Sequence, residues 1–330
     1  MIIDAYTHIL PAEVMQEIER RGARFGLLRR MMSVAGLHNL DERFRAMDTL
    51  GDYRQIISLP NPPIEAVADA SEAPGLARIA NDAMAELVRR HPDRFPAFIA
   101  SLPMHESEST LEELRYAVVN LGARGVQIFS NVNGHPLDEP QYQSIFAAMA
   151  EYDLPIWLHP TRTASWPDYH SEDRSRFEMW WCFGWPYETT VAMSRLALSG
   201  IFDRHPGLKI IVHHFGGMVP YFDKRIENGM ALLGSRSGQE EDARVLSSLK
   251  RPLIDYFHKF YADTALFGAS RGLRCGLDFF GFENVVFASD APFGPVAETR
   301  DGVSRLDTET THLDAIFHGN TERLVKMQVK

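Results

Sequence analysis

Four short apolar segments of this chain end in residues that can bind a metal ion. They are IIDAYTH ending at His8, PIWLHP with His159, KIIVHHFGG with His213 and His214, and VVFASDAPF with Asp290. Apolar runs rich in Val and Ile are typical of strands buried on both faces of a parallel sheet. A (β/α)8 barrel places its catalytic residues at the carboxyl ends of such strands. We therefore expect these four strand ends to converge on one pocket.

The residue types favour a catalytic metal. Neutral imidazole and carboxylate ligands together suit zinc, iron or manganese. His8, His159 and Asp290 would form a three-ligand site with positions left open for water and substrate. A bound metal lowers the pKa of its water and grips a substrate oxygen. We expect one divalent ion, with zinc as the first candidate and manganese or iron as alternatives, and Asp290 as ligand, proton carrier or both.

The two neighbouring histidines have different roles in this scheme. Side chains alternate along a strand, so His213 and His214 should point to opposite faces, and one of them should be structural. The strand pattern does not decide which. His214 lies beside the pair Gly216 and Gly217, where substrate can approach the backbone closely, and it is a candidate acid or base.

Strand-like and helix-like segments alternate along all 330 residues, with no linker between them. The strand candidates are residues 2–8, 54–60, 95–103, 125–130, 154–160, 208–215, 259–267 and 284–290. Eight strands with helices between them predict an α/β fold, a (β/α)8 TIM barrel, as one domain over residues 1–330. A doubly wound sheet would need a glycine-rich nucleotide-binding loop after an early strand, and the sequence has none.

A long aromatic stretch, residues 161–186, follows the fifth strand candidate. Long loops in compact domains are usually functional. We expect this insertion to fold over the mouth of the barrel. Its rings either pack as a plain cover or line a flat pocket for an aromatic or conjugated ligand. The rings belong to Trp166, Tyr169, Phe177, Trp180, Trp181, Phe183 and Trp185.

Composition narrows the class of protein. The net charge of −10 gives no basic field for nucleic acid. No apolar run is long enough to span a membrane, and the chain enters its first strand without a leader-like segment. The two cysteines, Cys182 and Cys275, form no disulfide framework. These features favour a cytoplasmic protein with a small-molecule partner and neither a nucleic acid nor a membrane partner.

The segments IDAYTHILP, FGWPYETT, KIIVHHFGG, ASDAPFG and GNTERLVKM together resemble the metal-dependent decarboxylases of the amidohydrolase superfamily. The chain is most similar to the 2-amino-3-carboxymuconate-6-semialdehyde decarboxylase family, with γ-resorcylate and 5-carboxyvanillate decarboxylases as cousins. The similarity covers nearly the whole chain. It implies an amidohydrolase-like barrel, one divalent metal, non-oxidative loss of CO2 from an aromatic or conjugated unsaturated carboxylate, and a homodimer.

Site roles follow from the resemblance residue by residue. It implies that His8, His159 and Asp290 are the metal ligands. It favours His214 over His213 as the catalytic histidine, acting together with Asp290. Two aromatic residues match positions near the substrate pocket of the family, and these are Trp181 and Phe293.

One position departs from the family pattern. The family motif HxH, or ExH in some cousins, reads Tyr6-Thr7-His8 here. A phenol has an ordinary pKa near 10 and is a poor ligand unless the metal ionises it. Tyr6 alternates with His8 to the same face of its strand, so we expect its oxygen to contact the metal, a metal-bound water or the substrate.

An anionic substrate in an acidic protein needs a local arginine. Arg162, just past His159, is a candidate by position, and Arg29 or Arg30 lies roughly where a family arginine falls. Two other functions stay open on the same barrel. One is a hydrolase or hydratase that uses metal-bound hydroxide, and the other is a binding protein in which Tyr6 marks a decayed site.

Overall fold

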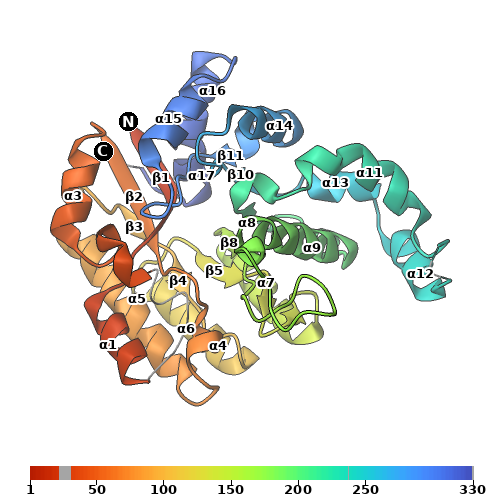
Figure 1. Ribbon diagram of the computed structural model, residues 1–330, viewed down its shortest axis with the longest axis horizontal. Coiled ribbons are helices and arrows are strands. Elements are labelled where there is room, and N and C mark those ends of the chain that lie inside the picture. The colour runs from red at the N-terminus through yellow and green to blue at the C-terminus, as the bar shows by residue number, and fades with distance from the viewer. Residues whose placement is uncertain (22–30, 237, 329–330) are drawn as a thin grey trace.

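Parallel strands close into a barrel at the centre of the molecule (Figure 1). The computed structural model describes residues 1–21, 31–236 and 238–328. Each of the eight predicted strands is present, although the third is split in two, so the predicted (β/α)8 barrel is confirmed. The strands of the barrel are β1 (Ile2–His8), β2 (Tyr53–Ser58), β3 (Ala97–Phe98), β4 (Ala100–Ser101), β5 (Val126–Phe129), β8 (Ile156–His159), β9 (Ile210–Val212), β10 (Tyr261–Asp263) and β11 (Val285–Val286); β6 (Asn131–Val132) and β7 (His135–Pro136) form a separate antiparallel pair.

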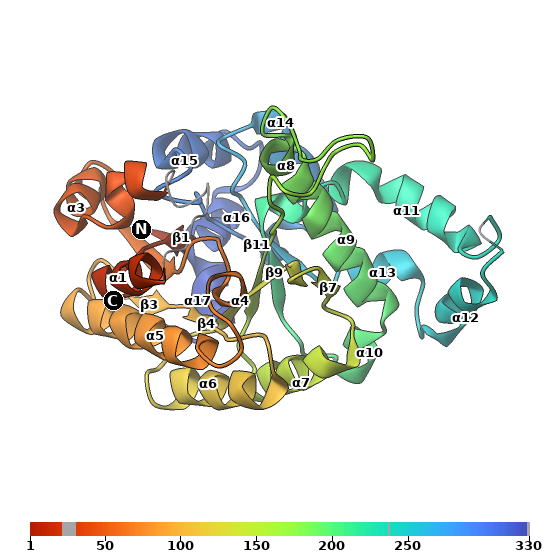
Figure 2. The same ribbon diagram turned by 60° about the horizontal axis from the view of Figure 1, so that its bottom comes forward.

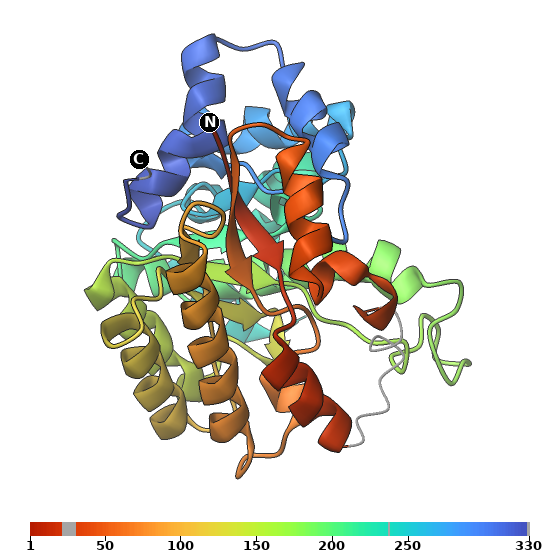
Figure 3. The same cartoon turned by 90° about the vertical axis from the view of Figure 1, so that its left-hand side faces the viewer.

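The strand order follows the chain around the barrel. One sheet has the order β1-β2-β3, and the second has the order β4-β5-β8-β9-β10-β11. The two sheets meet again between β11 and β1, where Ala5 N donates to Phe287 O at 2.8 Å and His8 N donates to Ala291 O at 2.7 Å. Figure 3 shows β1 and β2 side by side, with helices on their outer face. The strand ends therefore share one rim.

Helices and single turns surround the barrel (Figure 2). The α-helices are α1 (Ala12–Arg20), α3 (Leu40–Asp48), α4 (Ile64–Val67), α5 (Ala73–Arg90), α6 (Ser107–Val119), α7 (Gln143–Tyr152), α8 (Met179–Cys182), α9 (Gly184–Leu198), α10 (Ile201–Arg204), α11 (Asp223–Gly229), α12 (Glu240–Ser248), α13 (Leu253–Phe257), α14 (Ser270–Phe280), α15 (Val296–Ser304), α16 (Thr310–Asp314) and α17 (Asn320–Leu324). The short 3₁₀ turns are η1 (Ala35–Leu37), η2 (Pro140–Tyr142), η3 (His214–Gly216), η4 (Pro220–Phe222), η5 (Met230–Leu232) and η6 (Phe282–Asn284). The segment η7 (Ala315–Gly319) is a π-helix.

Two regions stand apart from the regular barrel. The segment that carries α11, η5 and α12 projects away from it in both Figure 1 and Figure 2. Residues 160–178, between β8 and α8, form neither helix nor strand. In the described part of the chain, no helix has the length and apolar character needed to cross a membrane.

A bulge in β1 turns two side chains toward the barrel interior. Ile3 and Ala5 belong to the buried cluster inside the barrel, as alternation requires, but so does the next residue, Tyr6. The pairing of β1 with β2 shifts register between Asp4 and Thr7. An extra residue on one strand reverses the alternation beyond it. Tyr6 and His8 therefore face the interior.

A buried acid ties this strand to the segment that leads to Asp290. Asp4 is fully buried, and its Oδ1 accepts a hydrogen bond from Ser289 N at 3.0 Å. Its Oδ2 accepts from Tyr53 OH at 2.5 Å and from the Ser289 hydroxyl. Burial raises the pKa of Asp4 from 3.8 to about 6, against the opposing effect of these hydrogen bonds. The acid fixes the backbone on which Asp290 depends.

Replacing Asp4 with Asn is expected to flatten the pH dependence of stability between about pH 4 and about pH 6. An acid whose pKa is raised on folding keeps its proton where the unfolded chain has lost it, so stability falls as the pH rises through this window. A rise from 3.8 to about 6 corresponds to about 3 kcal/mol. Urea unfolding of both proteins across the window measures the difference. Equal slopes in the two proteins would contradict the assignment.

Candidate active site

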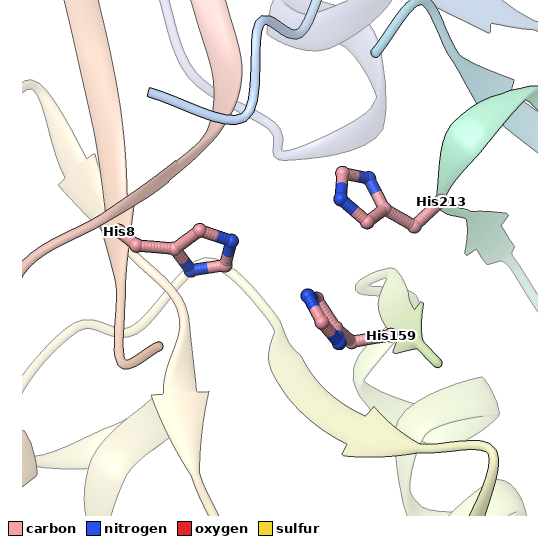
Figure 4. Close-up of side chains that lie close together, drawn as sticks. All are labelled: His8, His159 and His213. Atoms are coloured by element: carbon pink, nitrogen blue, oxygen red, sulfur yellow. The ribbon is translucent and has the colours of Figure 1, made fainter. Parts of the chain in front are cut away.

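Three histidines from distant strands point into one common space (Figure 4). His8 ends β1, His159 ends β8, and His213 directly follows β9. Their ring centroids lie 5.4 Å apart for His8 and His159 and 5.0 Å apart for His159 and His213. One ligand atom from each of the three lies within 4.8 Å of the others. All three are almost fully buried.

Each ring is oriented by a contact at its Nδ1 atom. Nδ1 of His8 lies 3.1 Å from Leu59 O, and Nδ1 of His159 lies 2.6 Å from Pro160 O. Nδ1 of His213 lies 2.5 Å from Oδ2 of Asp263. Carbonyl and carboxylate partners of this kind orient metal-binding histidines, leaving Nε2 free for the ion.

Two Nε2 atoms of the cluster lack a hydrogen-bond partner among the described residues. Nε2 of His8 and Nε2 of His213 are buried and make no hydrogen bond. Oδ1 of Asp290 lies 3.1 Å from the first atom and 3.7 Å from the second, without the direction of a hydrogen bond. Buried nitrogen atoms without partners are costly. A divalent cation would satisfy these atoms, so the residues fit a metal.

The carboxylate of this cluster is held in its charged form. Burial alone would raise the pKa of Asp290, but its close interactions with His213 and His8 outweigh it and hold the pKa below its ordinary value. Asp290 has a left-handed backbone, with φ of 64°. An ionised, mostly buried carboxylate can ligate a metal or accept a proton.

The charge states of the histidines differ. Burial, together with the nearby His213, holds the pKa of His159 and of His214 well below the ordinary value, so both are neutral. Burial also acts to lower the pKa of His213, but Asp263 and Asp290 outweigh it and raise this pKa to about 10. Neutral imidazole is the form that binds metal.

The expectation that His213 and His214 point to opposite faces is wrong. Their ring centroids lie 3.7 Å apart. Strand β9 ends at Val212, and His214 begins the turn η3 with a left-handed φ of 53°, so strand alternation does not apply to it. His214 stacks on Trp185 with ring centroids 6.4 Å apart. Both histidines thus lie at the site, and one ligand atom each from His213, His214 and Asp290 also falls within 4.8 Å.

A cavity opens above the cluster and has aromatic walls. The free space inside it is narrow, about 30 Å³. Two sequence candidates, Trp181 and Phe293, lie in its lining. Asn61, after β2, and Trp185, in α9, also line it; Asn61 had no sequence pattern to mark it. The complete lining among the described residues is His8, Asn61, His159, Trp181, Trp185, Asp290 and Phe293.

Tyr6 lies beneath the cluster, outside the lining of the cavity. Its side chain is fully buried, and its ring meets the His213 ring edge-on with centroids 4.9 Å apart. Its hydroxyl donates to Oε1 of Gln127 at 2.6 Å. We expected this oxygen to contact the metal, a metal-bound water or the substrate. In the structure it instead bonds to the Gln127 side chain inside the barrel. Strand alternation could not reveal a partner 121 residues away.

The arginine candidate near the site is paired with an acid. Nη1 of Arg162 lies 3.2 Å from Oε1 of Glu188, and Arg162 is outside the cavity lining. The expectation that Arg162 binds the substrate carboxylate directly is not met by this arrangement. The other candidates, Arg29 and Arg30, lie outside the described residues.

Comparisons with known proteins agree with this architecture. A family model described as Amidohydrolase matches residues 3–327. A γ-resorcylate decarboxylase of Polaromonas sp. is 33% identical over 87% of each chain. A 2-amino-3-carboxymuconate-6-semialdehyde decarboxylase of Dictyostelium discoideum is 31% identical over 71% of this chain and 61% of its own.

Solved structures give the same relationship. A dihydroxybenzoic acid decarboxylase of Polaromonas sp. with bound manganese and 2-nitroresorcinol has a TM-score of 0.81 and 28% identity, over 98% of this chain and 96% of its own. A 5-carboxyvanillate decarboxylase of Novosphingobium aromaticivorans, complexed with manganese and 4-hydroxy-3-methoxy-5-nitrobenzoic acid, has a TM-score of 0.85 and 25% identity, over 99% and 96%. From the family match and the sequence identity, the chain belongs to the amidohydrolase family.

Proposed function

We propose that this protein is a metal-dependent carboxy-lyase that removes CO2 non-oxidatively from an aromatic or conjugated unsaturated carboxylate. The observation that carries the proposal is one cavity in which a metal-binding cluster lies under aromatic walls. Trp181, Trp185 and Phe293 form those walls, and His8, His159 and Asp290 form the floor. Aromatic side chains favour a flat ring, and the family relationship supports decarboxylation of such a ring.

The ion would be held by His8, His159 and Asp290. When bound, it would supply a positive charge that grips the carboxylate and a neighbouring oxygen of the substrate. Zinc is one candidate, because imidazole and carboxylate groups are common zinc ligands. Manganese is the ion in the related solved structures, and it is the second candidate for this chain.

Two side chains would carry out the proton transfer. The ring carbon that bears the carboxylate gains a proton, the C–C bond breaks, and its electron pair restores the ring as CO2 leaves. Asp290 is ionised, so it can take a proton from bound substrate and deliver it to this carbon. His214 is neutral and stacked on Trp185, where it can orient or share that proton.

We also propose that residues 1–330 act as one domain, in the cytoplasm, and as a homodimer. The surface between α9 and the projecting segment α11–α12 supports the proposed homodimer. Tyr187, Met218, Phe222 and Leu232 contribute apolar side chains to a wide groove there. Tyr187 is 53% exposed and Leu232 is 53% exposed. Large exposed apolar groups of this kind are typical of interaction surfaces.

The test is CO2 release from metal-loaded protein supplied with hydroxylated benzoates, beginning with 2,6-dihydroxybenzoate. A chelator is expected to abolish release, and zinc or manganese to restore it. Incorporation of labelled water without CO2 release would favour a hydrolase or hydratase. Ligand binding without either reaction would favour a binding protein.

Replacing Asp290 with Asn should lower kcat by about 100-fold or more, because the amide cannot carry the proton. The change retains the size of the side chain. Steady-state kinetics at saturating metal measure the loss, and circular dichroism checks the fold. Activity within about threefold of the original protein would remove Asp290 from the proton transfer.

Replacing Tyr6 with Phe should cost stability while leaving the metal affinity unchanged. The variant keeps the ring but leaves Oε1 of Gln127 without its donor, at a cost of about 1–3 kcal/mol. Urea unfolding measures the stability, and chelator competition measures the metal affinity. A loss of kcat/KM of about tenfold or more in folded, metal-loaded protein would instead give the phenol a chemical role.

A further inference from the structure

The first strand contributes a single metal-binding side chain to the cluster. Residue 6 is a tyrosine, and its hydroxyl is used by Gln127. The protonated phenol that makes this hydrogen bond is a poor metal ligand. A further protein ligand for a metal at this site would therefore come from another strand.

His213 occupies the space directly beside the Tyr6 ring. The two ring centroids lie 4.9 Å apart in an edge-to-face arrangement with an interplanar angle of 85°. The ligand atom of His213 lies within 4.8 Å of the ligand atoms of His8 and His159. Figure 4 shows the three rings facing the same space. Nε2 of His213 is buried and has no hydrogen-bond partner. The atom is placed to meet an ion that His8 and His159 share.

Asp263 holds this histidine as a metal ligand is held. Asp263 ends β10, which pairs with β9, and it is fully buried. Its Oδ2 lies 2.5 Å from Nδ1 of His213, and its Oδ1 accepts a hydrogen bond from Ala265 N at 3.1 Å. A carboxylate at the far nitrogen fixes the ring and strengthens the metal-facing nitrogen as a donor.

We propose that His213 is a metal ligand that replaces the one missing at Tyr6, so that His8, His159, His213 and Asp290 hold the ion. Asp263 is the positioning residue for His213. The proposal rests on the metal site of the proposed function, but not on the reaction that the site catalyses. The competing arrangement is an imidazolium at His213 that bridges Asp263 and Asp290 and has no part in metal binding.

The adjacent histidine provides a matched control. His213→Gln and His214→Gln remove neighbouring rings whose centroids are 3.7 Å apart. Dissociation constants for Zn²⁺ and Mn²⁺ are measured by chelator competition, without substrate, and thermal unfolding confirms that both variants fold. We expect His213→Gln to weaken binding by about 100-fold or more and His214→Gln by less than about threefold. X-ray absorption of the zinc-loaded protein should show one imidazole fewer in His213→Gln.

Two further variants test the replacement itself. Asp263→Asn should weaken metal binding by about 10- to 100-fold, as loss of an orienting partner does. Adding Tyr6→His to His213→Gln should recover at least about tenfold of the lost affinity, because it returns a ligand to the first strand.

Several results would overturn the proposal. One is a metal affinity in folded His213→Gln equal to that of the original protein. Another is an equal loss of metal affinity in the His213 and His214 variants. The outcome is separate from that of the proposed function. Tight metal binding that depends on His213, in a protein that releases no CO2 from any substrate, would support the ligand and refute the decarboxylase.

Discussion

The burial of several imidazoles beside a carboxylate is the constraint on which the rest of the structure depends. Buried polar atoms destabilise a protein unless each has a partner. The Nδ1 atoms of His8, His159 and His213 have partners supplied by the ends of neighbouring strands or by the adjoining backbone. Their opposite nitrogens face one another and Asp290. A bound cation would complete the arrangement, so the fold and the ion are expected to stabilise each other.

The barrel supplies that geometry through local features of its first and last strands. The bulge in β1 turns Tyr6 and His8 inward, and Asp4 ties β1 to Ser289, immediately before Asp290. Asp290 adopts a left-handed backbone that few non-glycine residues tolerate. The hydrogen bonds at Ser289 hold that conformation from one side. The position of the carboxylate therefore depends on an acid that never faces the cavity.

The sequence predicted the barrel and the meeting of His8, His159 and Asp290, because buried parallel strands have a readable pattern and their carboxyl ends share one rim. It did not predict the orientation of His214, because a left-handed turn ends strand alternation there. The sequence also could not show the hydrogen bond from Tyr6 to Gln127 or the ion pair between Arg162 and Glu188, because each joins side chains that are distant in sequence. Periodicity describes elements, whereas pairing between elements depends on the folded geometry.

The proposed exchange of ligands also bears on how an anionic substrate is held. No arginine belongs to the cavity lining in the described ranges 1–21, 31–236 and 238–328. Imidazole binds a metal in its neutral form, so three histidine ligands and one carboxylate would leave a divalent ion with a net charge of about +1. A family site with glutamate in place of Tyr6 would be closer to neutral. The extra charge left by an imidazole ligand would attract the substrate carboxylate, which lessens the need for an arginine within this lining.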